Sequence, residues 1–208
     1  MIARRILLGL FGLAAAMATA PGLARSESAP AQPIAALNAG LQQVMTAGRA
    51  TPFEKRMATL TPIVQKSFDL PLLLENSVGP IRWTGISEAQ KAELLDAFTR
   101  FTVASYVANF DAANGDKFVI APDTRMSGKD TVVQTRIVGS AGEITKLDYV
   151  MRMTTGAWKV VDVLLDGTIS RVAVTRSDFR GLLATSDATR LIASLRGKVV
   201  KLAAGDAS

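Results

Sequence analysis

Residues 157–179 read Ala-Trp-Lys-Val-Val-Asp-Val-Leu-Leu-Asp-Gly-Thr-Ile-Ser-Arg-Val-Ala-Val-Thr-Arg-Ser-Asp-Phe, and this stretch decides the fold. The apolar run from Trp158 to Leu165 has the composition of a β-strand, and Asp166-Gly167 is a dipeptide typical of a tight turn. The polar segment that follows begins a helix. We therefore expect a strand that reverses into a helix here, with the rest of the sheet upstream.

Three upstream segments share this β-forming composition: 118–121, 130–138 and 143–154. Glycines mark the turns between them: Gly128, Gly139, Gly142 and Gly156. In the third segment, alternate residues from Leu147 to Met153 are apolar, which gives the strand one apolar face. Short turns between successive strands predict an antiparallel meander of four strands.

Elsewhere in the chain, apolar residues recur at helical spacing. Expected helices begin at Ile34, Thr51, Asp69 and Ser87, the last reaching about Ala112, and two more cover 170–183 and 187–196. Thr51 with Glu54 and Ser87 with Gln90 have the spacing of capping boxes. Pro62 is expected to bend or split its helix, and Gly79-Pro80 to end local order before Trp83. Helices on one face of an antiparallel sheet predict an α+β domain.

The N-terminus has the pattern of an export signal. Arg4 and Arg5 precede an apolar run from Ile6 to Ala18 that is short for a membrane span. We expect a signal peptide over 1–24, cleaved before Arg25, with an uncleaved anchor as the alternative. The predicted organisation is then a disordered linker over 25–33, one domain over 34–200 and a flexible tail over 201–208, in an exported protein.

Composition excludes several classes of function. The chain contains neither histidine nor cysteine, which removes the usual catalytic triads, thiol chemistry and most zinc sites. No metal and no cofactor are expected. The net charge of +6 comes from dispersed lysines and arginines, so nucleic acid is a poor candidate as a partner. Asp162 is the best candidate for a buried catalytic acid, and the competing interpretation is a structural hydrogen-bond acceptor.

Two blocks of sequence carry a distinctive order of residues. The first contains Trp158 to Val163, Gly167 with Ser170, and Arg176-Ser177 with Phe179. The second runs from Phe68-Asp69 through Val78-Gly79-Pro80-Ile81-Arg82-Trp83 to Ser87-Glu88-Ala89-Gln90 and the aromatic helix after it. Together the two blocks resemble the periplasmic MlaC and toluene-tolerance lipid-carrier family, and this resemblance places the protein in the periplasm. The turn from Gly167 to Ser170 and the Val-Thr-Arg-Ser-Asp-Phe run are most similar to the hopanoid-associated HpnM branch. Thr175 stands where a typical member has tyrosine.

The resemblance implies a non-enzymatic carrier that holds a phospholipid or hopanoid-type lipid in an apolar cavity between helices and sheet. It also implies an inner-membrane ABC-type lipid transporter and an outer-membrane component as partners, and we expect a monomer. The candidate wall residues are Phe68, Leu72, Val78, Trp83, Phe98, Phe101, Tyr106, Tyr149, Met151, Met153, Trp158, Val160, Val163 and Phe179. The candidate mouth residues, which would meet an anionic head, are Arg82, Arg171 and Arg176.

Two alternatives remain open on the sequence alone. The same fold could carry an isomerase or dehydratase that acts on a hydrophobic substrate with Asp162 as base. It could also be an envelope adaptor with a filled core, in which case no cavity of ligand size would exist.

Overall fold

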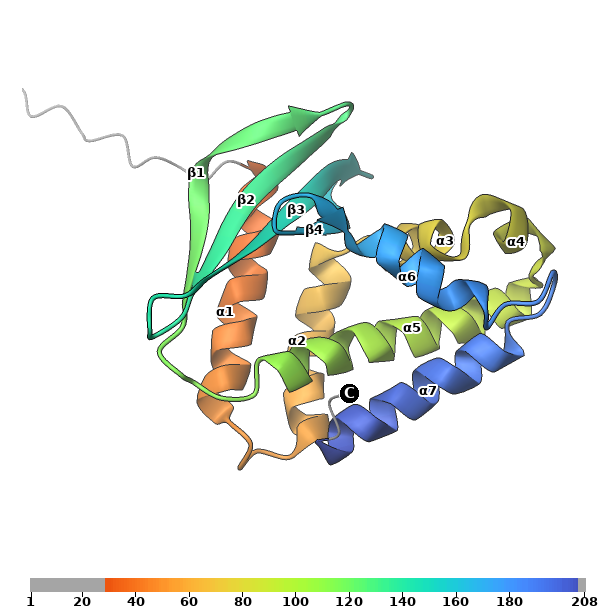
Figure 1. Ribbon diagram of the computed structural model, residues 1–208, viewed down its shortest axis with the longest axis horizontal. Helices are drawn as coiled ribbons and strands as arrows, with labels where there is room; N and C mark the ends of the chain where they lie inside the picture. Colours follow the sequence, from red (N-terminus) through yellow and green to blue (C-terminus); the bar gives the residue numbers. More distant parts are fainter. Residues whose placement is uncertain (1–28, 206–208) are drawn as a thin grey trace, which may run out of the picture.

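A computed structural model describes residues 29–205 of the chain. The predicted signal peptide and its cleavage site lie outside the described residues. Figure 1 shows an antiparallel sheet at one end of the molecule, with helices α1 and α2 packed against it and helices α5, α6 and α7 extending to the other end. The predicted α+β class is confirmed.

The sheet has five strands in the order of the sequence: β1 Lys117–Ser127, β2 Asp130–Val138, β3 Ile144–Thr154, β4 Ala157–Leu165 and β5 Ile169–Ser170. The predicted antiparallel meander is therefore confirmed, with one short strand added at its edge. β1 continues beyond the predicted end at Ala121 because a bulge between Ile120 and Thr124 absorbs Pro122, which cannot donate a ladder hydrogen bond.

Two of the turns require backbone that favours glycine. Thr155 and Gly156, which join β3 to β4, both have positive φ, at 48° and 81°. Asp166 and Gly167, which follow β4, have φ values of 50° and 75°. Consecutive positive φ angles are typical of the tight turns that match the twist of antiparallel strands. The turn expected from the Asp166-Gly167 dipeptide is confirmed.

Seven α-helices follow a short 3-10 helix at Ala29–Ala31: α1 Gln32–Ala47, α2 Phe53–Ser67, α3 Leu70–Val78, α4 Pro80–Gly85, α5 Glu88–Asn109, α6 Arg171–Arg180 and α7 Thr189–Ala204. Two of the predicted helix starts are confirmed by their caps. Asp69 accepts a hydrogen bond from the Leu72 amide at 3.2 Å, and Ser87 accepts one from the Gln90 amide at 3.3 Å.

The ordered domain is longer than predicted at both ends. The linker expected over 25–33 is wrong for residues 29–33, because Ala31 is buried and Pro33 fits the first turn of α1, where no amide hydrogen is needed. The tail expected over 201–208 is wrong for residues 201–204, which continue α7 while Leu202 packs against the core.

Three local predictions are also corrected. Thr51 does not cap α2, because its hydroxyl donates to the Ala47 carbonyl at 3.0 Å and Pro52 takes the capping position. Pro62 does not split α2. Because proline has no amide hydrogen, the Ala58 carbonyl lacks its helical hydrogen bond, but Pro62 and Ala58 both lie on an exposed side of the helix. Gly79 ends α3 but does not end local order, because α4 begins at Pro80.

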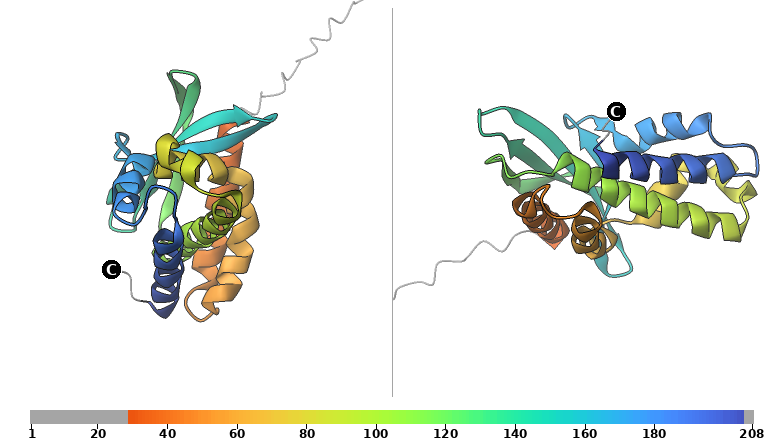
Figure 2. Two further views of the ribbon diagram at one scale, coloured as in Figure 1. Left: turned by 90° about the vertical axis from the view of Figure 1, so that its right-hand side faces the viewer. Right: turned by 90° about the horizontal axis from the view of Figure 1, so that it is seen from below.

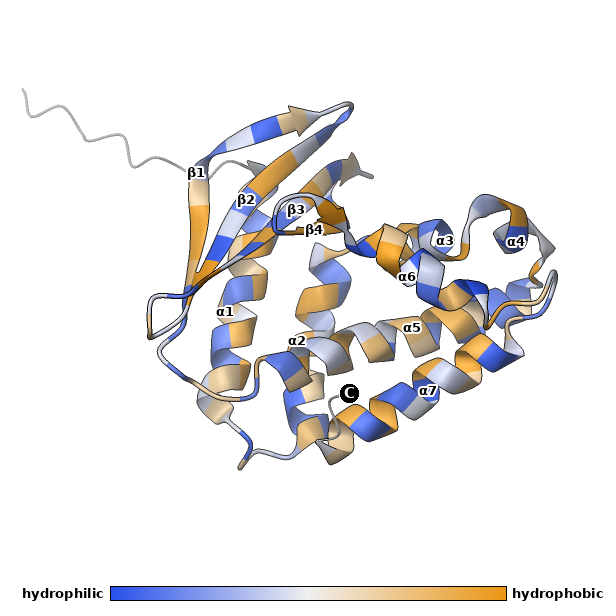
Figure 3. Ribbon diagram, in the orientation of Figure 1, coloured by the Kyte–Doolittle hydropathy of each residue, from blue (hydrophilic) through white to orange (hydrophobic). Residues whose placement is uncertain are grey.

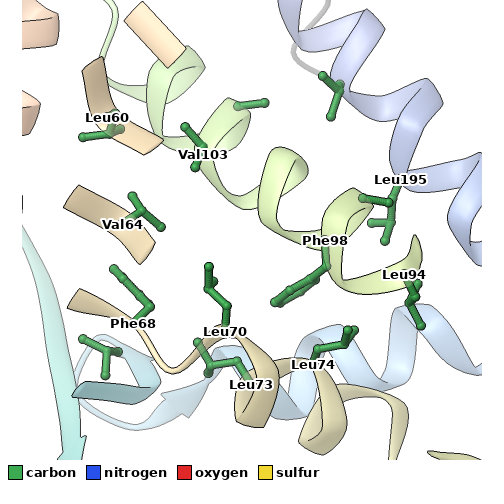
Figure 4. Packing of buried hydrophobic residues seen from close by; sticks show 14 of the residues in the cluster. Leu60, Val64, Phe68, Leu70, Leu73, Leu74, Leu94, Phe98, Val103 and Leu195 are labelled. Carbon is green, nitrogen blue, oxygen red and sulfur yellow. The ribbon is translucent and has the colours of Figure 1, made fainter. Parts of the chain in front are cut away.

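The core lies where the helices meet the inner face of the sheet. Figure 4 shows that the core continues between the helices, with Leu60 of α2, Leu74 of α3, Leu94 of α5 and Leu195 of α7. These four are almost completely buried. Gly40 permits the close approach of α1 to α2, since a Cβ at this position would lie 2.5 Å from Cδ1 of Ile63. Figure 3 shows the matching alternation of apolar and hydrophilic residues along the helices.

An ion pair joins β2 to β3 at the end of the sheet that carries the turn between β1 and β2. Arg152 on β3 donates from Nε and Nη2 to the two carboxylate oxygens of Asp130 on β2, each at 2.7 Å. These hydrogen bonds are the largest cause of the lowered pKa of Asp130. A paired, two-pronged geometry of this kind is stronger than an ordinary surface ion pair.

We predict that Arg152→Ala lowers the free energy of unfolding by about 1 kcal/mol at neutral pH, since both hydrogen bonds are lost. Because the folded-state pKa of Asp130 is lowered, the stabilisation is present above the unfolded pKa of about 3.9 and is lost as the pH falls through the folded value. Urea unfolding of both proteins from pH 7 down to pH 3 checks this. A difference between them that stays constant over this range would contradict the assignment.

Candidate functional site

A cavity of about 530 Å³ lies between the inner face of the sheet and helices α3, α5 and α6. Its volume is within the range of about 300–1,000 Å³ that is usual for small-molecule sites. Its wall is formed by Phe68, Leu73, Ser77, Phe98, Phe101, Thr102, Ser105, Tyr106, Asn109, Phe110, Ile137, Thr145, Leu147, Asp162, Val163, Leu165, Arg171, Val172 and Thr175.

Helix α5 supplies the longest side of the cavity. Its lining residues fall on one helical face from Phe98 to Asn109, while Leu94, Val103 and Val107 on other faces are buried in the core. From Phe98 to Phe110, just past its end, the chain rises roughly 18 Å at 1.5 Å per residue. The acyl chains of one bilayer leaflet span about 15 Å, half of the hydrocarbon core. The cavity is thus as long as an acyl chain.

The hydroxyl groups on the wall do not make the cavity polar. Thr102 donates to the Phe98 carbonyl and Ser105 to the Phe101 carbonyl, both at 2.8 Å, and Ser77 donates to the Leu73 carbonyl at 2.7 Å. The protons of these three hydroxyl groups are used within their own helices and are not available to a ligand. These three positions therefore add little polarity to the wall.

Polarity is instead graded along the cavity. Phe68, Leu73, Ser77 and Phe98 are buried and mark the closed end, whereas Asn109, Thr145 and Arg171 are exposed and mark the mouth. Arg171, the first residue of α6, has no ion pair among residues 29–205. The cavity consequently has an apolar interior and one unpaired cation at its mouth.

A row of aromatic rings runs along the cavity wall towards β1. The Tyr106 ring lies 5.9 Å from that of Phe68 and 6.2 Å from that of Phe110, and Phe110 lies 5.7 Å from Phe118. At the closed end Phe98 contacts Phe179 edge to face at 6.4 Å. Aromatic pairs at these distances stabilise one another beyond the area they bury, so the wall is held in place by its own residues.

The chain's two tyrosines form a buried pair, with Tyr106 on the cavity wall and Tyr149 behind it. The hydroxyl groups of Tyr106 on α5 and Tyr149 on β3 are hydrogen-bonded to each other. Burial raises the pKa of Tyr149 to about 12. Burial and the neighbouring Tyr149 raise the pKa of Tyr106 well above its usual value, opposed only by the charge of Arg171. Both phenols are neutral at physiological pH.

Asp162 lies on the cavity wall beside a bulge in β4, and its carboxylate is engaged on both oxygens. Oδ1 accepts from the amides of Val163 at 2.8 Å and Val172 at 3.1 Å, and Oδ2 accepts from the Ser170 hydroxyl at 2.5 Å. Ser170 in turn caps α6 through the Ala173 amide at 3.0 Å. These contacts support the structural interpretation of Asp162 and leave no oxygen poised as a base.

Five of the fourteen predicted wall residues line the cavity: Phe68, Phe98, Phe101, Tyr106 and Val163. Nine do not: Leu72, Val78, Trp83, Tyr149, Met151, Met153, Trp158, Val160 and Phe179. Val78, Met151 and Val160 are fully buried in the core, and Tyr149 and Phe179 stand behind lining residues. Met153 is exposed opposite Trp158 at the far end of the sheet, and Trp83 on α4 lies under Lys91.

Of the predicted mouth residues, Arg171 reaches the cavity. Arg176 faces α3 and donates to the Asn76 carbonyl at 2.8 Å, and Arg82 lies on α4 away from the wall. The lining residues missed from the sequence include the small and polar members of the α5 stripe, Thr102, Ser105 and Asn109. Their helical spacing with Phe98, Phe101 and Tyr106 was the available signal, which a selection by aromatic character passes over.

Within 29–205 no three potential ligand side chains are grouped so that they could hold a metal ion. In the same range, none of the helices combines the length and the apolar character that a bilayer span requires.

We predict that tyrosinate absorbance of the folded protein does not appear until the pH reaches about 12, because both tyrosines belong to the buried pair. In denaturant the same residues should titrate near pH 10. Since the folded pKa values are raised, the stability contributed by the pair is intact below about pH 10 and is lost as the pH rises towards 12. An absorbance change near pH 10 without unfolding would contradict the burial of the pair.

Comparison with known proteins finds a matching family model and several similar solved structures. The family model described as MlaC protein matches residues 36–197. A solved structure of a phospholipid-binding protein from Ralstonia solanacearum, in complex with a phospholipid, is similar with a TM-score of 0.71 and 18% identity, covering 85% of this chain and 99% of that one. No curated protein matches the chain.

The structural similarity establishes the fold, and the family match extends over most of the helices and all five strands. The chain therefore belongs to the MlaC protein family.

Proposed function

We propose that the protein is a periplasmic lipid carrier that holds one lipid by its tails in the cavity and moves it between the inner and outer membranes. The observation that carries the proposal is the gradient of the cavity, from the buried rings of Phe68 and Phe98 to the exposed cation of Arg171. Each buried CH₂ contributes about 0.8 kcal/mol, so one acyl chain supplies enough free energy for stable retention.

Membership of the MlaC family supports the same proposal, because lipid-binding carriers of that family are not enzymes. The Ralstonia protein of the same fold was solved with a phospholipid. The engaged carboxylate of Asp162 gives no support to the alternative of an isomerase. A cavity of about 530 Å³ contradicts the adaptor with a filled core, for which no ligand-sized space was expected.

The cargo is a phospholipid or a hopanoid-type lipid, and we place the chain in the hopanoid-associated HpnM branch. The extended turn from Gly167 to Ser170 and the Thr175 found in place of tyrosine support the branch. Thr175 lines the cavity, so a smaller side chain there enlarges the space next to α6. The proposed partners are an ABC-type transporter of the inner membrane and an outer-membrane component, with this protein as a monomer between them.

We predict that native mass spectrometry of the protein purified from periplasm without detergent detects one bound lipid. The mass of the released lipid distinguishes a phospholipid from a hopanoid. Thr175→Trp should reduce the bound fraction at least ten-fold, because the indole fills the cavity beside α6. Ser177→Trp is the matched control, since Ser177 is exposed on the same helix. Protein that stays empty after incubation with both lipid classes would overturn the carrier function.

We predict that Arg171→Gln weakens retention of an anionic phospholipid by about ten-fold, which corresponds to one charge-assisted hydrogen bond. Retention of a neutral hopanoid should change little. Arg136→Gln serves as control, because Arg136 is an exposed arginine on the outer face of the sheet. Competition between the two lipids for a limiting amount of protein, measured by mass spectrometry, gives the ratio of their affinities for each variant. If Arg171→Gln and Arg136→Gln had equal effects on retention, Arg171 would not be a headgroup contact.

A further inference from the structure

The charge of the described chain is distributed unevenly along the sequence. Residues 29–170 contain fourteen lysines and arginines and fourteen aspartates and glutamates, so this part of the fold is neutral. Residues 171–205 contain seven cations and two acids, a net charge of +5. The seven cations are Arg171, Arg176, Arg180, Arg190, Arg196, Lys198 and Lys201. All the excess positive charge of residues 29–205 is therefore carried by α6, α7 and their connection.

Both helices lie on the same side of α5. In Figure 1, α6 lies above α5 and α7 lies below it. In Figure 2, both helices lie to the left of α5 in the left view and above it in the right view. Gln90 at the start of α5 contacts Thr189 at the start of α7. Further along both helices, Lys198 of α7 lies 5.5 Å above the ring of Phe101 of α5, so the two helices run parallel. We call this side, formed by residues 171–180 and 189–204, the α6–α7 face.

Most of the cations on this face are not neutralised. Arg196 is paired with Glu93 at 3.4 Å, and Arg176 is bonded to a carbonyl of α3. The other five form no ion pair with any residue that the structure describes. Of the two acids in residues 171–205, Asp187 is already bonded to Gln90 and Thr189, which leaves Asp178. The face is thus a broad cationic surface rather than a lattice of ion pairs.

Exposed apolar side chains are present among these cations. Val200, which is 70% exposed, lies between Lys198 and Lys201 on α7. Ile169, which is 50% exposed, lies two residues before Arg171 at the mouth of the cavity. Cations surrounding isolated apolar residues are typical of surfaces that rest in the headgroup region of a bilayer.

We propose that the α6–α7 face docks the protein on the surface of an anionic phospholipid bilayer. The inference goes beyond the proposed function, which concerns the cavity, and it rests on the charge distribution and on the exposed apolar side chains among the cations. A bilayer is favoured over an acidic protein because the cations spread over two helices, and because Val200 on α7 and Ile169, in the short strand just before α6, are exposed singly among them. Arg171 belongs both to this face and to the mouth, so docking brings the mouth against lipid.

The test measures co-sedimentation of the full mature protein with two kinds of vesicle, one of phosphatidylcholine and one of equal parts phosphatidylcholine and phosphatidylglycerol. Binding should be strong to the anionic vesicles only and should fall steeply between low and high salt, as the screening length shrinks from about 10 Å at 0.1 M to 3 Å at 1 M. Each cation near such a surface strengthens binding about five-fold.

The informative variant is Arg180→Gln with Arg190→Gln and Lys201→Gln, because these cations are exposed and unpaired and do not line the cavity. Its affinity for anionic vesicles should fall on the order of 100-fold. The matched control removes the same charge elsewhere through Lys66→Gln, Lys117→Gln and Lys146→Gln, and its affinity should fall less than ten-fold. Native mass spectrometry of both variants reports whether the bound lipid is retained.

The outcomes separate docking from carriage. Weak vesicle binding by the α6–α7 variant, with its bound lipid retained, establishes the face as the docking surface. Equal losses in both triple variants, or equal binding of the wild type to neutral and anionic vesicles, overturns the proposal without affecting the cavity. Wild-type protein that binds neither vesicle also overturns it and assigns the face to an acidic protein. An empty cavity together with normal docking would instead contradict the proposed function.

Discussion

The cavity depends on how the carboxylate of Asp162 joins β4 to α6. Its two oxygens bind the amides of Val163 and Val172 and the hydroxyl of Ser170, which itself caps the helix. Three of these contacts fix the start of α6 relative to the strand from which it departs. Because Arg171, Val172 and Thr175 of α6 form one wall of the cavity, the size of the space follows from this junction. A half-buried carboxylate with both oxygens hydrogen-bonded is well suited to hold such an angle.

Much of the architecture could be predicted from the sequence, because local rules agree with the final fold. The Asp166-Gly167 turn, the caps at Asp69 and Ser87 and the alternation along β3 each follow from residue chemistry within a few positions. The errors arose where tertiary context decides. Pro62 is tolerated because its side of α2 faces solvent, and β1 passes through Pro122 because a bulge absorbs it. Neither the solvent exposure at Pro62 nor the bulge at Pro122 can be inferred from the neighbouring residues.

The cavity itself was harder to predict than the fold. An apolar residue at core periodicity has the same sequence pattern whether it faces packed atoms or empty space. Tyr106 and Tyr149 illustrate this, because both are aromatic and buried, yet one lines the cavity and the other supports it from behind. The distinction depends on how far α5 lies from β3, a distance set by contacts among α2, α3 and α5. Small residues such as Ser105 contribute the space, and they carry little signal by themselves.

The strand order of the sheet has a consequence for how the molecule assembles. Every strand pairs with its neighbour in the sequence, so the loops that must close are only a few residues long, and closing them costs little chain entropy. Low contact order of this kind is associated with rapid folding. The segment from β1 to α6 is continuous in sequence and holds two of the cavity walls, the sheet and α6, whereas α3 and α5 precede it. The sheet can therefore form early, and the helices can then pack against it.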